Sequence, residues 1–132
     1  MEIQKKILLI DDEDIIIEVT EGMLVYLGYE VKIAKDSNEA LKIFTQAFKE
    51  NNYFDLIIVD LCLLNGVSGY DLFQKIIKID PNAKTIISSG YSTDPMIENY
   101  KNYGFSGAIT KPYKLDDLIK VLNSVFESKE KT

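Results

Sequence analysis

Short apolar or β-branched runs alternate along the chain with longer segments whose apolar residues recur every three or four positions. Short, nearly continuous apolar runs predict buried strands, whereas apolar residues that recur every three or four positions predict helices. The first, third and fourth runs are apolar almost throughout, which is typical of strands covered on both faces. The second alternates polar and apolar residues and suits a sheet edge. The five predicted strands are residues 7–10, 30–34, 56–59, 85–88 and 107–110.

A helical segment follows each strand, with a turn or cap residue near its ends. Gly28 suits a left-handed helix end, Ser37 precedes the second helix, and Asp94–Pro95 reads as an N-cap followed by a first helical residue. The fourth helix should end at Gly104. The predicted inward stripes are Ile16, Thr20, Met23 and Leu27; Leu41, Phe44 and Phe48; Leu72, Phe73, Ile76 and Ile77; Met96, Ile97 and Tyr100; and Leu118, Val121, Leu122 and Val125.

Five strand–helix repeats predict an α/β fold with one parallel sheet, right-handed crossovers and helices on both faces. In such folds ligands bind beyond the carboxyl ends of the strands. The length of 132 residues favours a single domain over residues 1–132. No apolar run approaches the roughly 20 residues of a membrane span, and the N-terminus does not look like a signal peptide, so a cytoplasmic protein is expected.

Composition excludes several functions. The chain has no histidine and one cysteine, Cys62, which argues against zinc sites, internal disulfides and histidine-dependent nucleophiles. Its net charge is −6, and its 15 basic residues are all lysines spread along the chain, so nucleic acid is not an expected partner.

Charged and hydroxyl residues collect where the predicted strands end. Carboxylates so close together would be destabilised unless a cation shared them, and oxygen-only ligands favour Mg²⁺, with Mn²⁺ as the alternative ion. Each of these residues also has an ordinary structural interpretation. The two acids after the first strand fit a solvated turn or the start of a helix. The acid after the third strand fits a turn, and the lysine after the fifth fits an exposed surface position. Their conjunction favours a site that binds a phosphoryl group. These residues are Asp11, Asp12, Asp60, Ser88, Ser89, Gly90 and Lys111.

These motifs, LLIDDED, DLIIVDL, SSGY and TKPY, resemble those of response regulator receiver domains. The resemblance covers about residues 5–128. It implies a flavodoxin-like (βα)5 fold with strand order 2-1-3-4-5. It also implies a signalling module rather than a metabolic enzyme, one that accepts a phosphoryl group from a histidine kinase or histidine phosphotransfer protein and slowly hydrolyses it.

By this resemblance Asp60 would be the phosphoacceptor. Asp12 and Asp60 would bind Mg²⁺ directly, Asp11 through a water molecule, and Cys62 through its backbone carbonyl. Ser89, with Gly90 after it, would be the switch hydroxyl, and Lys111 would contact the phosphoryl group. The bond to Pro112 would be cis. Cys62 and Tyr91 would flank the attacking water, so a bulky Tyr91 is predicted to slow hydrolysis.

The sequence departs from the family pattern at two places. Leu64 stands where receivers usually have proline, and Gly69 comes one residue later than usual, which predicts a longer loop with a turn at Asn65–Gly66. Ala108 replaces the aromatic residue that commonly moves with the switch hydroxyl. Output is therefore expected to travel through the backbone around the fourth helix. The loops otherwise look most like those of receivers in hybrid histidine kinases.

Two further interpretations remain open. The aromatic residues Tyr100, Tyr103, Phe105 and Tyr113 fit either core packing or a docking surface for a kinase, a downstream partner or a second copy. The chain also fits a receiver-like module that binds proteins without phosphorylation. An aspartate-nucleophile phosphatase is disfavoured because Cys62 stands where such an enzyme needs a second acid.

Overall fold

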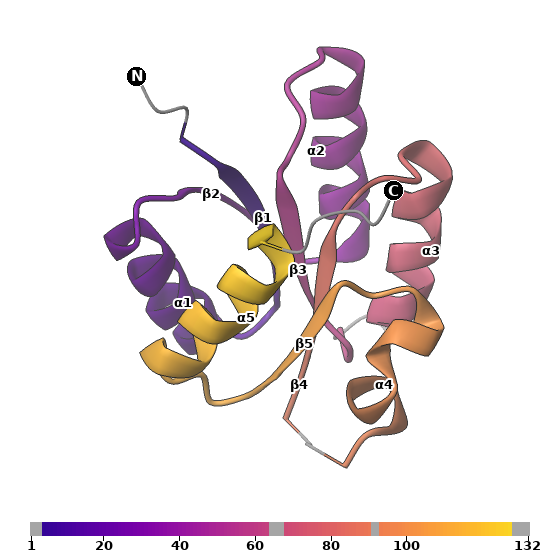
Figure 1. Cartoon of the computed structure of the whole chain (residues 1–132). Helices are drawn as coiled ribbons and strands as arrows, with labels where there is room; N and C mark the ends of the chain where they lie inside the picture. Colours follow the sequence, from indigo (N-terminus) through magenta and orange to yellow (C-terminus); the bar gives the residue numbers. More distant parts are fainter. Residues whose placement is uncertain (1–3, 64–67, 91–92, 128–132) are drawn as a thin grey trace.

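The computed structural model describes residues 4–63, 68–90 and 93–127. Its centre is a five-stranded parallel sheet with strand order β2-β1-β3-β4-β5 (Figure 1), which confirms the predicted fold class. Each predicted strand is present within one residue at either end. The strands are β1 (Lys6–Ile10), β2 (Glu30–Ala34), β3 (Leu56–Asp60), β4 (Thr85–Ser89) and β5 (Gly107–Thr110).

Helices cover both faces of the sheet. α1 (Asp14–Tyr26) and α5 (Leu115–Glu127) lie on one face, and α2 (Ser37–Lys49), α3 (Gly69–Ile79) and α4 (Pro95–Glu98) lie on the other (Figure 1). A 3₁₀ helix, η1 (Tyr100–Tyr103), continues from α4. The two layers enclose two hydrophobic clusters, one on each side of the sheet.

The strands of the sheet interior send successive side chains to opposite clusters. In β1, Ile7 and Leu9 belong to the cluster under α1 and α5, whereas Leu8 and Ile10 belong to the cluster under the other helices. β3 alternates in the same way, with Leu56 and Ile58 on the α1/α5 side. Side chains alternate between the two faces with a period of two. Asp11, which follows Ile10, and Asp60, which follows Val59, therefore both face the α1/α5 side.

Most helix predictions are confirmed, with corrections in α1, in α2 and in the fourth helix. In α1 the buried residues are Ile17, Thr20 and Leu24. Thr20 was predicted, and Met23 and Leu27 pack partly buried against the α1/α5 cluster as expected, but Ile17 rather than Ile16 is the buried residue near the start of the helix. α2 is capped by the Asp36 carboxylate, which accepts a hydrogen bond from Glu39 N, and Ser37 is the first helical residue.

The fourth helix is shorter than predicted. Asp94 is its N-cap, as expected, and Gly104 ends η1 in a left-handed conformation. Between them the α-helix stops at Glu98, because the backbone of Asn99 leaves the helical conformation, with φ −119° and ψ 37°. The Asn99 side chain donates a 3.3 Å hydrogen bond to the Pro95 carbonyl, an alternative to a further helical turn. The turn predicted at Asn65–Gly66 lies outside the described residues.

Gly69, the residue that opens α3, lies against the end of β3. A Cβ atom at this position would stand 2.2 Å from the carbonyl oxygen of Asp60, and Gly69 N donates a 2.7 Å hydrogen bond to the carbonyl of Leu61. A side chain therefore does not fit. This close approach explains why glycine stands here although the preceding loop is longer than usual.

Candidate functional site

The sheet brings Asp11, Asp60 and Lys111 together at its carboxyl edge. Lys111 Nζ lies 2.8 Å from Asp11 Oδ2 and 3.1 Å from Asp60 Oδ2. All three side chains are largely buried: Asp11 is 1% exposed, Asp60 is 4% exposed and the Lys111 side chain is 10% exposed. Residues that are 49 and 51 positions apart along the chain thus form one ion cluster, as the parallel-sheet prediction requires.

The surroundings change the pKa of two members of this cluster. Burial raises the pKa of the Asp60 carboxyl group; Lys111 opposes that rise, and Asp11 adds to it. Burial by itself would lower the pKa of Lys111, but its hydrogen bonds to Asp11 and Glu13 and the negative charge of Asp60 outweigh burial and raise it. Lys111 is therefore a fixed positive charge at neutral pH.

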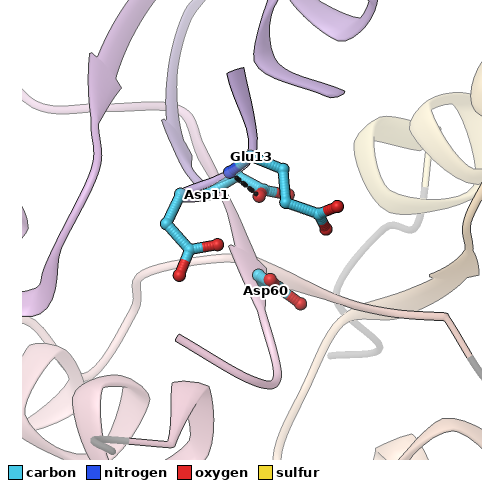
Figure 2. A group of neighbouring side chains, drawn as sticks. Asp11, Glu13 and Asp60 are labelled. Carbon is cyan, nitrogen blue, oxygen red and sulfur yellow. Dashed lines mark hydrogen bonds between the residues drawn. The ribbon is translucent and has the colours of Figure 1, made fainter. Parts of the chain in front are cut away.

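Glu13 is a member of the cluster that the sequence reading did not identify. Its Oε1 lies 3.0 Å from Lys111 Nζ, and its backbone N donates a 2.9 Å hydrogen bond to Asp11 Oδ1. Figure 2 shows Asp11, Glu13 and Asp60 gathered at this edge, with that hydrogen bond dashed. The four consecutive acids gave a hint, but nothing in their order indicates that Glu13 reaches Lys111 in addition to Asp11.

Four acids at this edge could share a cation. Asp11, Asp12, Glu13 and Asp60 each offer a carboxylate oxygen, and these oxygens lie within 4.8 Å of one another. Both oxygens of Asp11 already have partners in the protein, since Oδ1 accepts from Glu13 N and Oδ2 contacts Lys111. An all-oxygen donor set without histidine fits a hard ion such as Mg²⁺.

A pocket of about 330 Å³ opens beside Asp60, and the predicted phosphoryl-binding residues line it. Cys62 contributes its backbone, whose N lies 3.3 Å from Asp60 Oδ1 as a donor, while its side chain is exposed. Ser89 is buried at the end of β4, and its carbonyl accepts a hydrogen bond from Lys111 N. Tyr91 lies outside the described residues. The lining residues are Glu13, Asp60, Cys62, Ser89, Gly90 and Lys111.

The segment after Lys111 returns to the sheet. The Lys111–Pro112 peptide bond is cis, in agreement with the expectation. Tyr113 then packs against the α1/α5 cluster, and its hydroxyl group is hydrogen-bonded to the hydroxyl group of Ser88 in β4. Burial raises the pKa of Tyr113 to about 12.

The four aromatic residues suggested as a docking surface do not form one surface. Phe105 is a core residue, and its ring centroid lies 4.3 Å from that of Phe73. Tyr100 and Tyr103 pack against the same cluster as Phe105, whereas Tyr113 packs on the opposite side of the sheet. Of the two interpretations, core packing therefore holds for Phe105, and the four residues do not form a single docking surface because β5 separates Tyr113 from the other three.

Exposed large apolar residues occur elsewhere. Among the described residues they are Ile15, Val19, Val25 and Tyr26 of α1, together with Tyr53. In the part of the chain that the structure describes, no helix has both the length and the apolar character needed to cross a bilayer.

Comparison with known proteins gives one family. The model of the response regulator receiver domain matches residues 7–123. Among curated proteins, the chemotaxis protein CheY of Thermotoga maritima is 29% identical over 92% of this chain and 97% of its own length. The transcriptional regulatory protein ComA of Bacillus subtilis is 32% identical over 81% of this chain, but the chain spans about half (49%) of ComA.

Solved structures agree with the fold. A CheY-like receiver domain protein from Methanospirillum hungatei superposes with a TM-score of 0.79 at 32% identity, over 95% of this chain and 96% of the other. The receiver domain of the sensor histidine kinase PA1611 from Pseudomonas aeruginosa gives a TM-score of 0.81 over 96% of this chain and 100% of the other. Its identity is 24%, so it supports the fold alone; that structure has a magnesium ion coordinated in its active site cleft.

Proposed function

Because the chain belongs to the family of response regulator receiver domains, we propose that it accepts a phosphoryl group on Asp60 in a Mg²⁺-dependent reaction. The observation that carries this proposal is the ion cluster at the carboxyl edge, where Lys111 Nζ lies 3.1 Å from Asp60 Oδ2 and 2.8 Å from Asp11 Oδ2. A fixed ammonium beside a buried carboxylate suits the transfer of an anionic group to that carboxylate.

The proposed reaction begins with a phosphohistidine of a histidine kinase or a histidine phosphotransfer protein. An oxygen of Asp60 attacks the phosphorus, the phosphorus–nitrogen bond breaks, and the imidazole leaves with the bond electrons and takes up a proton. Lys111 would then contact the phosphoryl oxygens, and the Ser89 hydroxyl would turn toward them. Hydrolysis of the aspartyl phosphate by water returns Asp60 to its original state.

The residues proposed to hold Mg²⁺ are Asp12 and Asp60 directly, the backbone carbonyl of Cys62, and Asp11 through water. The indirect role for Asp11 is supported by its two oxygens, which already bind Glu13 N and Lys111. When bound, the ion would neutralise charge on the transferred group and help to align it. All of these donors are oxygen atoms, the ligand type that Mg²⁺ prefers, and water molecules would complete the coordination of the ion.

Signal output is proposed to leave through the end of β4 and through α4. Ala108 cannot act as an aromatic switch, and α4 is only four residues long with no fully buried residue. The sequence features around SSGY further support a place among the receivers of hybrid histidine kinases. In that case the expected partner is a histidine phosphotransfer protein.

Intact mass spectrometry after incubation with acetyl phosphate tests the proposal. With Mg²⁺ the wild-type chain should gain one phosphoryl group, and with EDTA it should gain none. Asp60→Asn should abolish the gain. Asp55→Asn is a matched control, because Asp55 is an exposed acid directly before the other end of β3. A chain that gains nothing under any condition would instead favour a protein-binding module that works without phosphorylation.

A further inference from the structure

We propose that the hydrogen bond between Ser88 and Tyr113 positions Lys111 for the reaction at Asp60, so that both hydroxyl residues are positioning residues; this inference rests on the proposed function. Ser88 lies in β4, with Asp60 of β3 and Ile109 of β5 as its register partners. Tyr113 follows Lys111 by two residues. The bond therefore joins the strand beside the phosphoacceptor to the turn that carries the lysine.

Two hydrogen bonds connect the segment around Lys111 to β4. Lys111 N donates a 2.8 Å hydrogen bond to the carbonyl of Ser89, and two residues later the Tyr113 hydroxyl meets Ser88. Consecutive residues of β4 thus hold both sides of the lysine backbone. The first hydrogen bond continues the β-ladder, whereas the second needs two specific side chains.

Tyr113 is also the residue that fastens this turn to the core. Its neighbours Pro112 and Lys114 are exposed, and α5 begins only at Leu115, whereas Tyr113 packs against the α1/α5 cluster. Lysine has a long flexible side chain, so its ammonium stays between Asp11 and Asp60 only if its backbone is fixed. A displacement of about 1 Å at a reacting group can reduce a rate by as much as roughly 100-fold.

Packing alone does not explain the hydroxyl groups. A buried hydroxyl costs stability unless it is hydrogen-bonded, and an apolar pair of similar shape would fill the same space without that cost. Burial also raises the pKa of Tyr113 to about 12, so its hydroxyl keeps its proton at neutral pH and remains available as a donor. The pair adds a directional contact at the place where Lys111 must be held.

The test removes each hydroxyl in turn. Tyr113→Phe, Ser88→Ala and the double variant are compared with wild type for the rate of phosphorylation by acetyl phosphate with Mg²⁺. Each single variant should be slower by about tenfold, and the double variant should be no slower than either one, because all three lack the same bond. Thr85→Val is the control, since Thr85 is another fully buried hydroxyl residue of β4, at the opposite end of the strand.

A second readout separates positioning from stability. The ¹⁵Nζ signal of Lys111 in NMR spectra should be sharp in wild type and Thr85→Val and broadened or shifted in Tyr113→Phe. Urea unfolding confirms that each variant is folded. Wild-type phosphorylation rates together with an unchanged Lys111 signal in Tyr113→Phe would overturn the inference, even if that variant were less stable. If wild type itself gains no phosphoryl group, the proposed function fails, and the Lys111 signal still decides whether the pair holds the lysine.

Discussion

Two lysine–aspartate pairs lie at the carboxyl edge of the sheet, and each has a nitrogen–oxygen distance of 2.8 Å. Lys111 and Asp11 lie in the ion cluster, where their side chains are 10% and 1% exposed. Lys35 and Asp14 lie on the flank formed by the end of β2 and the start of α1, where they are 58% and 80% exposed. The interaction energies of the two pairs therefore differ although their distances are equal, because water screens the exposed pair much more than the buried one.

The same contrast applies to two glycines. Gly69 lies against the backbone of Asp60, where a Cβ atom does not fit, whereas Gly22 lies within α1 and has open space where a Cβ atom would stand. At the site, close packing and buried charge fix the residue type. At the exposed pair and at Gly22, solvent and open space constrain the residue type less. Pairs of matched substitutions, one at the site and one away from it, test this difference.

The largest effect is expected for the buried lysine. Lys111→Met would leave Asp11 and Asp60 buried without their cation, and removal of one partner of a buried ion pair costs about 3 kcal/mol. Lys35→Met should leave the free energy of unfolding unchanged within error. Urea unfolding of both variants in EDTA at neutral pH measures the difference, and equal effects would show that the cluster is screened like the flank.

A smaller loss is expected when Gly69 is replaced. Gly69→Ala places a methyl group 2.2 Å from the Asp60 carbonyl, so the start of α3 must move, at a cost of about 2 kcal/mol. Gly22→Ala should stabilise the protein by about 0.5–1 kcal/mol, because alanine is the better helix former. Thermal unfolding of the two variants checks the opposite signs. If Gly69→Ala left the thermal stability unchanged, the contact between α3 and β3 would relax easily.

The smallest effect has the opposite direction at the site itself. Burial raises the pKa of Asp60 above its ordinary value of 3.8, so ionisation of this carboxyl group lowers the stability of the folded protein. This loss of stability is absent at a pH below the ordinary pKa. It is complete once the pH exceeds the raised pKa. Asp60→Asn should therefore be more stable than wild type by about 1 kcal/mol at neutral pH without Mg²⁺. The advantage should disappear at acidic pH. An advantage that does not depend on pH would have another cause.

The regular part of the molecule could be predicted from the sequence because it follows local patterns. All five strands show β-branched or alternating runs, and their order in the chain places Asp60 and Lys111 at one edge. The first inward residue of α1 was predicted as Ile16 because Ile15, Ile16 and Ile17 are consecutive, so apolar residues occur on nearly every side of that helix. Only packing against the sheet selects Ile17.

The remaining details depend on contacts between distant segments. Ser88 and Tyr113 are 25 residues apart, and their hydrogen bond exists because β5 ends beside β4 and the chain then turns back over the sheet. A tyrosine three residues beyond the end of a half-buried strand was a hint that its hydroxyl needs a partner. The separation of Phe105 and Tyr113 onto opposite faces has the same origin, since β5 lies between them.

Chemical mapping of the modified residue tests the central claim most directly. After incubation with acetyl phosphate and Mg²⁺, borohydride reduces an aspartyl phosphate to homoserine, and peptide mass spectrometry locates that residue. The account predicts homoserine at position 60 alone, with none formed in EDTA. Homoserine at Asp11, Asp12 or any other position, or unmodified peptide throughout, would contradict it.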